Sequence, residues 1–289
     1  MRFWKVNGAG NDFILLNDWE RALPDAALGA LARLVCHRRL GVGADGLMVV
    51  RPPEQGGDYK MLFYNADGSM GEMCGNGARC ICLYGAESGL GAEDCQRVET
   101  TAGLVTGYRT EGGNWRVRLN DPSVVDLART VETGEGVYTC AYVELGSPGI
   151  PHAVVSLPGL RQREPETLRD LGRALRYHPS FPRGANVNFY ERLGPDRIFL
   201  RTYERGVEDF TYACGTGTGA AVLALALRGE LNDSADAEMR GGVLHVDLER
   251  AGGRVRNLWL TGPAAVVAKG ELTDARLGEV CSGSPAAAQ

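Results

Sequence analysis

The segment Ala213-Cys214-Gly215-Thr216-Gly217 stands at the start of a run rich in alanine and leucine, residues 215–228, which predicts a helix. Earlier in the chain, Met73-Cys74-Gly75-Asn76-Gly77 precedes a second predicted helix, residues 75–87, in the same way. Each segment places a cysteine at or next to the N-terminus of a helix. The fold is predicted from these two segments, because other features of the sequence recur around both of them.

Three features lie upstream of the two cysteines at matching distances. Asn65 and Arg205 each lie nine residues before the cysteine of their half. Gly43-Ala44-Asp45 lies 31 residues before the first cysteine, and Gly184-Ala185-Asn186 lies 30 before the second. Gly-rich stretches open 66 and 68 residues upstream, at positions 8 and 146. Chance matches among glycines are the competing explanation, but three features in one register favour an internal duplication.

A duplicated chain folds as two similar domains. We expect residues 1–120, completed by a strand within 263–275, to carry Cys74, and residues 121–262 to carry Cys214. Alternating or β-branched apolar runs bounded by turn residues predict strands at 13–16, 47–50, 60–64, 115–119, 138–145, 185–190, 197–203, 243–248 and 258–267. Helical patterns cover 25–37, 75–87, 164–175 and 215–228. Strands outnumber helices, which predicts an α+β fold.

The composition excludes several classes of protein. The chain has 289 residues, 44% hydrophobic and 23% charged, as in an ordinary globular protein of about two domains. Its formal net charge is −5 and no run of Lys or Arg forms a basic stripe, so nucleic acid is not an expected partner. The N-terminus shows no apolar signal region, and the longest apolar run, residues 220–227, is too short to span a bilayer. We therefore expect a cytoplasmic protein with no membrane partner.

Metal and cofactor sites are not expected either. The eight cysteines show no Cys-x-x-Cys spacing and are accompanied by four histidines. Three lysines leave few candidates for a Schiff base with pyridoxal phosphate, and no Gly-Lys-Ser/Thr motif occurs. Most thiols are expected to be reduced, buried and structural. Cys74 and Cys214 are the exceptions, because a buried structural cysteine does not need the glycines that follow them.

A thiol at a helix N-terminus is a usable base. Unpaired N–H groups and the helix dipole favour anions there and lower a thiol pKa from its free value of about 8.5. Glycines let a substrate carboxylate approach those N–H groups. If the domains face each other across a pseudo-twofold axis, Cys74 and Cys214 approach one ligand from opposite sides. One thiolate and one thiol can then invert an α-amino-acid centre without pyridoxal phosphate.

The chain resembles the diaminopimelate epimerases and related pyridoxal-independent amino-acid racemases over nearly its whole length. The matching motifs are Gly8-Ala9-Gly10-Asn11-Asp12-Phe13, Gly41-Val42-Gly43-Ala44-Asp45-Gly46, Asn65-Ala66-Asp67-Gly68-Ser69, Met73-Cys74-Gly75-Asn76-Gly77-Ala78-Arg79-Cys80, Pro151-His152, Asn186-Val187, Tyr203-Glu204-Arg205-Gly206, Ala213-Cys214-Gly215-Thr216-Gly217 and Thr261-Gly262-Pro263. The resemblance implies two pseudo-symmetric domains, each a mixed, mostly antiparallel β-sheet wrapped around a central helix. It also implies a homodimer.

The resemblance implies a reaction and a set of residues for it. LL-2,6-diaminopimelate and its meso form interconvert, on the route to lysine and peptidoglycan, with Cys74 and Cys214 as the acid/base pair. His152 and Glu204 take up or return protons at the two thiols. The family's substrate contacts fall on Asn11, Asn65, Asn186, Glu204 and Arg205, and its carboxylate contacts on Gly75, Asn76, Gly215 and Thr216.

Ordinary structural roles compete with these assignments. His152 follows a proline and reads as a hydrogen-bonded loop histidine, and Glu204 with Arg205 reads as a surface ion pair. Asn11, Asn65 and Asn186 all border turns, where an asparagine side chain commonly forms a hydrogen bond with its own backbone.

Two positions depart from the family pattern and keep other functions open. Ile150 replaces an asparagine before Pro-His, and Phe210 stands near a common Glu-Thr-Leu, which leaves a related racemase of another amino acid as the nearer alternative. The order Cys74, His152, Asn186 also fits a cysteine hydrolase or acyltransferase, although it gives the second cysteine motif no purpose. A purely binding protein is a third reading.

Overall fold

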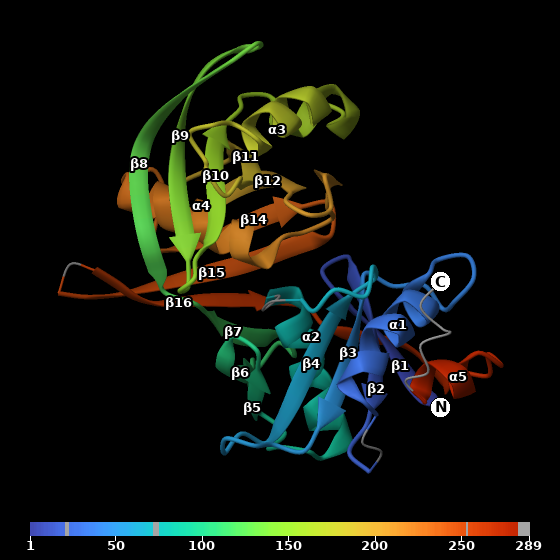
Figure 1. Ribbon diagram of the computed structural model, residues 1–289. Coiled ribbons are helices and arrows are strands. Elements are labelled where there is room, and N and C mark those ends of the chain that lie inside the picture. Colours follow the sequence, from blue (N-terminus) through green and yellow to red (C-terminus); the bar gives the residue numbers. More distant parts are fainter. Residues whose placement is uncertain (21–22, 72–74, 253, 283–289) are drawn as a thin grey trace. The chain divides into compact units, whose positions relative to one another are not determined.

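The chain forms two compact units that are built on one plan (Figure 1). The computed structural model describes residues 1–20, 23–71, 75–252 and 254–282. The first unit comprises residues 1–117 and 263–289, and the second comprises residues 118–262. None of the helices in the described part of the chain is long and apolar enough to cross a membrane.

The first unit combines a sheet with three helices. Its strands are β1 (Arg2–Gly8), β2 (Asn11–Asn17), β3 (Gly46–Arg51), β4 (Tyr59–Asn65), β5 (Cys95–Thr100), β6 (Gly103–Arg109), β7 (Trp115–Leu119), which ends just inside the second unit, and β17 (Ala265–Glu271). Its helices are α1 (Asp25–Cys36), α2 (Gly75–Ser88) and the short α5 (Leu277–Cys281).

The second unit contains β8 (Pro122–Thr133), β9 (Gly136–Leu145), β10 (Ile150–Ser156), β11 (Asn186–Arg192), β12 (Arg197–Glu204), β13 (Asp209–Phe210), β14 (Ser234–Met239), β15 (Gly242–Ala251) and β16 (Arg254–Gly262). Its helices are α3 (Arg169–Arg176), preceded by the 3₁₀ turns Leu160–Gln162 and Pro165–Leu168, and α4 (Gly215–Leu227).

The two sheets pair their strands in the same succession of directions. The order β17-β1-β2-β3-β4-β5-β6-β7 is antiparallel except for the parallel pairs β2–β3 and β4–β5. The order β8-β9-β10-β11-β12-β14-β15-β16 is antiparallel except for the parallel pairs β10–β11 and β12–β14, at the same two places. In each unit a helix connects the strands of each parallel pair. The fold is therefore α+β with two pseudo-symmetric units, as expected.

Each sheet wraps around a central helix. The described residues of α4 from Thr218 to Ala226 are all buried, and those of α2 are buried from Gly75 to Gly85. A helix that is buried on all sides belongs in the centre of a core. Figure 1 shows α2 and α4 each inside the curve of its own strands.

The other face of each sheet carries a second apolar layer. In the first unit, α1 and α5 cover it, with Leu28, Leu31 and Val280 packed against residues of β2 to β4. In the second unit, α3 and the preceding 3₁₀ turns cover it through Leu168, Leu171 and Leu175. In the first unit, β2 and β3 are thus buried on both faces, and their central residues form continuous apolar runs instead of alternating.

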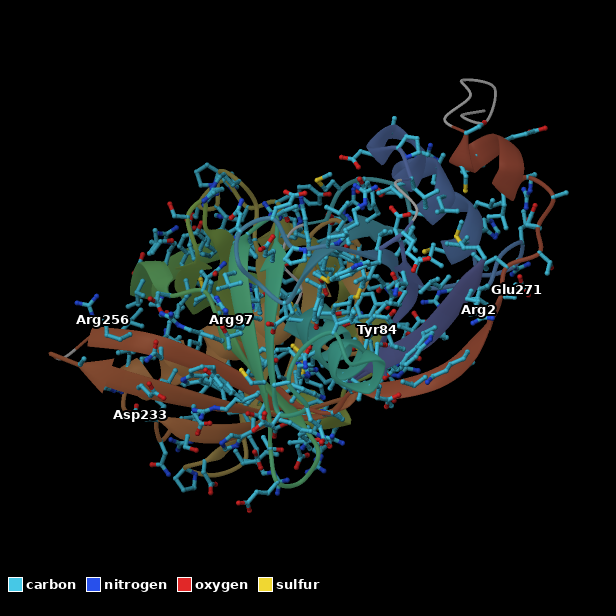
Figure 2. The ribbon with its side chains drawn as sticks, turned by 90° about the horizontal axis from the view of Figure 1, so that it is seen from below. Arg2, Tyr84, Arg97, Asp233, Arg256 and Glu271 are labelled. Atoms are coloured by element: carbon cyan, nitrogen blue, oxygen red, sulfur yellow. The ribbon has the colours of Figure 1, made fainter. Side chains whose placement is uncertain are left out.

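The first unit is closed by residues from the far end of the chain. β17 pairs antiparallel with β1 from Arg2 opposite Glu271 onward, and Figure 2 shows these two residues side by side. Beside this pair, Trp4 meets the ring of Tyr84 on α2 edge to face at 4.8 Å, and the Lys269 ammonium lies 3.4 Å from the Trp4 ring centre. The N-terminal strand is therefore held by both the central helix and the C-terminal strand.

Most of the expected elements are confirmed, with clear exceptions. The predicted strand 258–267 is wrong, because it is two strands, β16 and β17, which end and begin on either side of Pro263. Proline has no N–H to donate to a ladder, so it interrupts the run. The predicted helix 164–175 is a 3₁₀ turn starting at Pro165, followed by α3 from Arg169. Strands β1, β5, β6, β8, β10, β13 and β14 were not predicted.

Candidate active site

Cys214 occupies the N-cap of α4, as the sequence predicts. Its Sγ accepts a hydrogen bond from the backbone N–H of Gly217 at 3.4 Å, and the Thr216 hydroxyl lies 3.6 Å from the same sulfur. The N-cap acceptor takes one of the donors that the helix itself cannot satisfy. An N–H donor aimed at sulfur stabilises a thiolate relative to a thiol, so the end of this helix suits a cysteine that acts as a base.

Gly217 is required where α4 begins. A Cβ at this position would lie 2.2 Å from Asn188 Oδ1 and 3.2 Å from Cys214 Sγ. The first distance is below any real contact, so a side chain here would push the helix end away from β11. The second glycine of this Cys-Gly-x-Gly motif therefore sets the close approach of the cysteine to the strands beside it.

Four buried polar residues lie beside this helix end, and we call them the neutral cluster: His152 on β10, Asn186 and Asn188 on β11, and Thr202 on β12. The Asn188 amide nitrogen lies 3.3 Å from His152 Nδ1, and the Thr202 hydroxyl donates to Asn188 Oδ1 at 2.9 Å. Asn186 donates from its amide to the Pro151 carbonyl at 3.2 Å. Hydrogen bonds without ion pairs thus join three adjacent strands.

His152 is an uncharged member of this cluster. Burial, together with the positive charge of Arg205, lowers the pKa of its imidazole to about 3. His152 lies within β10, opposite Asn186 in the parallel pair, so the reading as a loop histidine is wrong. The strand assignment was missed because Pro151 precedes it.

Glu204 and Arg205 follow one another where β12 ends. The Arg205 backbone N–H donates to Asn186 Oδ1 at 2.9 Å, which ties the turn after β12 to the start of β11. Its guanidinium donates to the Arg183 carbonyl at 3.3 Å and is close enough to act on the His152 pKa. Glu204 pairs with Asp209 of β13 across the turn. The structure thus brings Asn186, Arg205 and His152 together.

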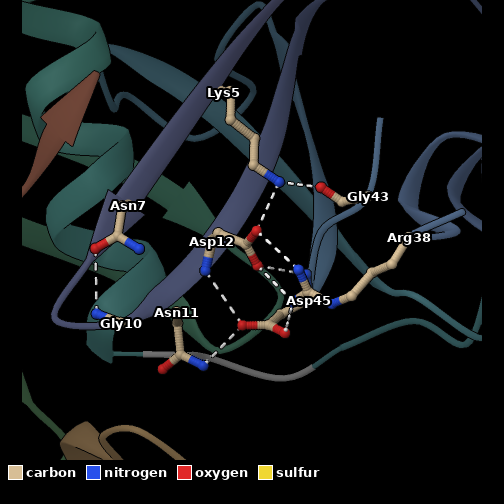
Figure 3. A network of polar contacts seen from close by, with 8 residues as sticks. All are labelled: Lys5, Asn7, Gly10, Asn11, Asp12, Arg38, Gly43 and Asp45. Carbon is tan, nitrogen blue, oxygen red and sulfur yellow. Dashed lines mark hydrogen bonds and ion pairs between the residues drawn. The ribbon is translucent and has the colours of Figure 1, made fainter. Parts of the chain in front are cut away.

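Four charged residues lie at the corresponding place in the first unit (Figure 3), and we call them the charged cluster: Lys5, Asp12, Arg38 and Asp45. Asp12 receives Lys5 at 2.6 Å and Arg38 at 2.8 Å, and Arg38 also reaches Asp45 at 2.6 Å. The pKa of Asp12 is lowered, because the hydrogen bonds and charges of Arg38 and Lys5 outweigh the opposing effect of burial.

The charged cluster continues into α2 through asparagines. Asn11 donates from its amide to Asp45 at 3.0 Å, and its oxygen accepts from the Asn76 amide. The oxygen of Asn76 in turn accepts from the guanidinium of Arg79 at 2.8 Å. Asn76 and Arg79 are both fully buried, so this chain of bonds runs from the sheet edge into the central helix. Asn11 and Asn76 are therefore in direct hydrogen-bond contact.

The remaining predicted residues of the first unit lie nearby or outside the described part. Asn65 ends β4 opposite Gly46, and its amide donates to the Ser69 hydroxyl at 2.9 Å within an exposed turn. Gly75 is the first residue of α2. Cys74 lies outside the residues that the structure describes. Among the described residues, no group of three or more His, Cys, Asp or Glu is arranged to hold a metal ion.

Sequence reasoning missed Asn188, Thr202 and Arg79. All three are fully or almost fully buried polar residues. A signal for Asn188 was present, because Asn186-Val187-Asn188 puts two asparagines on one face of a buried strand. Phe210, which departs from the family pattern, packs its ring against Tyr203 at 5.6 Å and Phe189 at 6.2 Å. Its side chain thus serves the apolar layer under α3.

Comparison with known proteins gives consistent results. Residues 3–125 and 145–267 match the family model described as diaminopimelate epimerase. The diaminopimelate epimerase of Desulforudis audaxviator is 37% identical over 286 residues, with 94% of this chain and 99% of that protein covered. The diaminopimelate epimerase of Aquifex aeolicus is 36% identical, with 95% and 98% covered.

Solved structures with much lower identity share the fold. A probable proline racemase from Agrobacterium radiobacter K84 superimposes with a TM-score of 0.71 at 18% identity and covers 99% of this chain and 95% of its own. A phenazine biosynthesis protein of the PhzF family from Bacillus anthracis gives a TM-score of 0.70 at 14% identity, covering 95% and 99%.

Proposed function

Because this chain belongs to the diaminopimelate epimerase family, we propose that it interconverts LL-2,6-diaminopimelate and meso-diaminopimelate without pyridoxal phosphate. The observation that carries the proposal at the site is Cys214 at the N-cap of α4, where its sulfur accepts from the Gly217 N–H and lies beside the Thr216 hydroxyl. The duplicated Cys-Gly-x-Gly motif supports a second such thiol at Cys74.

Two thiols suffice for the proposed reaction. One cysteine, as thiolate, takes the α-proton, so that a C–H bond breaks and an S–H bond forms. The electron pair passes into the α-carboxylate, where donors at helix N-termini stabilise the developing charge. The other cysteine, as thiol, gives its proton to the opposite face of the same carbon and becomes the thiolate. The reverse reaction exchanges the two roles.

The substrate contacts are proposed residue by residue. Gly75, Asn76, Gly215 and Thr216 supply the carboxylate site, since they form the first turns of α2 and α4. Asn11, Asn65, Asn186, Glu204 and Arg205 hold the amino-acid end that does not react. We also propose that Glu204 and His152 act beside the thiols. A planar guanidinium is suited to a carboxylate, which supports Arg205 as the anchor for the distal end.

Other parts of the assignment stay predictions. The homodimer and the cytoplasmic location follow from the family resemblance and the sequence, and they can be checked by sedimentation and by cell fractionation. The place in lysine and peptidoglycan precursor synthesis follows from the proposed substrate.

Proton NMR in D₂O tests the function directly. Reduced protein is mixed with LL-diaminopimelate, and separately with a panel of ordinary L-amino acids, with no cofactor added. We expect loss of the α-proton signal with diaminopimelate alone. Exchange into a different amino acid would move the assignment to a related racemase and would give Ile150 a role in specificity. No exchange with any of them would refute the proposal.

The largest expected effect is that of the cysteines. Cys214→Ala and Cys74→Ala should each abolish epimerisation, with a loss of at least about 10²–10⁴-fold, because each direction needs one base and one acid. Cys95→Ala and Cys140→Ala are the matched controls, one half-buried and one in the apolar layer, and should keep turnover. Retained turnover in Cys214→Ala or in Cys74→Ala would contradict the two-base mechanism.

Arg205→Lys tests the distal anchor. A point charge does not replace a planar fork, so the Michaelis constant should rise by about tenfold or more, with a smaller change in kcat. The backbone N–H that reaches Asn186 is kept in this variant, so the turn itself should remain. An unchanged Michaelis constant would contradict the role.

A further inference from the structure

The His152 ring has one nitrogen that nothing in the described part of the chain satisfies. The ring is fully buried, its Nδ1 faces the Asn188 amide at 3.3 Å, and its Nε2 has no hydrogen-bond partner there. A buried polar atom left unpaired costs about 1–3 kcal/mol. Such an atom in a native fold calls for a reason, and a bound ligand is one.

The surroundings of Asn188 decide which nitrogen carries the proton. The Asn188 amide nitrogen faces the backbone carbonyls of Ala153 at 3.3 Å and Asn186 at 3.2 Å. Carbonyl oxygens only accept, so this atom is the NH₂ group. The Asn188 oxygen on the other side accepts from the Thr202 hydroxyl at 2.9 Å. The two hydrogens of this NH₂ group are shared among the two carbonyls and His152 Nδ1, so a proton on Nδ1 would point at another donor and Nδ1 is the nitrogen without a proton.

A neutral imidazole that accepts at Nδ1 carries its proton on Nε2. The unpaired buried atom is thus an N–H donor, not a free lone pair. It cannot take a proton at Nε2, and giving one up would leave an imidazolate anion in a buried site, which is costly. A group in this state can donate a hydrogen bond but cannot act as a base.

Asn188 also contacts the end of α4 that carries the cysteine. Its oxygen lies where a Cβ of Gly217 would be, and the N–H of Gly217 donates to Cys214 Sγ. Asn188 therefore touches the imidazole on one side and the first turn of α4 on the other. Asn188 is fully buried and is not one of the predicted substrate-binding residues.

We propose that Asn188 is a positioning residue that holds His152 in the Nε2–H form, so that His152 acts as a hydrogen-bond donor to an anionic oxygen of the substrate and not as a proton acceptor. This inference rests on the proposed function only in one respect, which is the identity of the ligand. The form of the imidazole follows from the contacts of Asn188.

Nitrogen NMR of the histidine rings tests the proposal without any turnover. The chain has four histidines, and the signal of His152 is identified by its loss in His152→Gln. In the unmodified protein we expect a protonated Nε2 and an unprotonated Nδ1 for His152 at neutral pH. A proton on Nδ1, or a ring that titrates near its ordinary pKa, would overturn the proposal whatever the variants do.

Asn188→Asp then reverses the contact, because a carboxylate accepts where the amide donates. The proton should move to Nδ1, and kcat should fall by at least tenfold with a smaller change in the Michaelis constant. Asn188→Ala should lose the preference for one tautomer. Asn232→Asp, at an exposed position in the same unit, is the control for the added charge and should change neither readout.

The outcomes separate this proposal from the proposed function. If diaminopimelate exchanges normally but the imidazole is in the other form, only the role of Asn188 fails. If no amino acid exchanges while the Nε2–H form is observed, the function fails and the positioning of His152 stands. An unchanged kcat in a folded Asn188→Asp protein with a moved proton would show that the tautomer does not matter to turnover, and would overturn the role.

Discussion

The charged cluster of the first unit and the neutral cluster of the second lie at matching places on matching sheets. Both lie where the first parallel pair of strands begins, β2 with β3 in one unit and β10 with β11 in the other. Asp45 and Asn186 occupy the same position of the repeated motif. One cluster is joined by ion pairs with the partly exposed Arg38, and the other by hydrogen bonds among fully buried groups.

This difference shows what duplication preserves and what it leaves free. Backbone pairing constrains both units equally, so the strand directions are the same. The polar groups at the start of the parallel pair need partners, but either charges or neutral amides can supply them. Ion pairs suit the unit where solvent reaches Arg38 and Asp45, since full burial of charges can cost more than their attraction returns.

Asp45 and Asn186 are equivalent residues, and giving each one the side chain of the other should produce the largest difference in stability between the two clusters. Asn186→Asp puts a carboxylate among buried neutral groups and against the Pro151 carbonyl, which should cost about 3 kcal/mol of unfolding free energy. Asp45→Asn keeps an oxygen for Asn11 and loses a pair with the exposed Arg38, so about 1 kcal/mol is expected. Urea unfolding of both variants measures the costs.

Equal costs for the two exchanges would mean that the clusters do not differ in their tolerance of charge. Hydrogen exchange of peptides from β2–β3 and β10–β11 serves as the internal control, because each variant should lose protection in its own unit only.

Acidification should lower the stability of the second unit before that of the first, and this effect should be smaller than that of the exchanges. The folded pKa of His152 is about 3, below its ordinary value of 6.5, because of burial and Arg205. The unfolded chain therefore binds this proton first, and the second unit loses stability as pH falls from 6.5 toward 3. The pKa of Asp12 is lowered from 3.8, so its contribution to the first unit is lost only below that pH.

Hydrogen exchange between pH 7 and 4 measures this order. Peptides of β10 and β11 should lose protection before those of β2 and β3, and His152→Gln should reduce the difference. Simultaneous loss in both units would contradict the separate titration of the two clusters.

Salt should produce the smallest effect. Arg38→Ala removes contacts to Asp12 and Asp45, but its side chain is 60% exposed, so the cost should stay within about 1 kcal/mol and should shrink in 1 M NaCl. Thr202→Val removes one neutral hydrogen bond in the second unit at a cost of about 1 kcal/mol, and this cost should be equal at low and high salt. A salt-dependent cost at Thr202 would count against a neutral cluster.

Much of the fold was predictable because the relevant signals are local. The Ala- and Leu-rich run predicts α4, and the glycines after Cys214 predict its N-cap. The strands that were missed lack such signals. β8 is largely exposed and mixes polar with apolar residues, and β10 contains Pro151. The strand prediction ran β16 and β17 together across Pro263, because apolar residues continue on both sides of it.

The site was predictable where a residue acts through its own segment, and not where it acts through a distant one. Cys214 is positioned by the helix that follows it. Asn188 depends on His152 and Thr202, which are brought to it by strand pairing from elsewhere in the chain. Nothing in the local sequence states which strands become neighbours. A polar residue within an apolar run indicates a buried hydrogen-bonding position, but it does not indicate which distant residues are its partners.

The pairing of β1 with β17 has a consequence for synthesis on the ribosome. The second unit is continuous in sequence, so all its strands exist before β17 has been translated. The first unit is begun first and completed last, and until then β1 presents an open edge with unpaired N–H and C=O groups. The later unit can therefore be completed during synthesis before the earlier one, against the usual order for multidomain proteins.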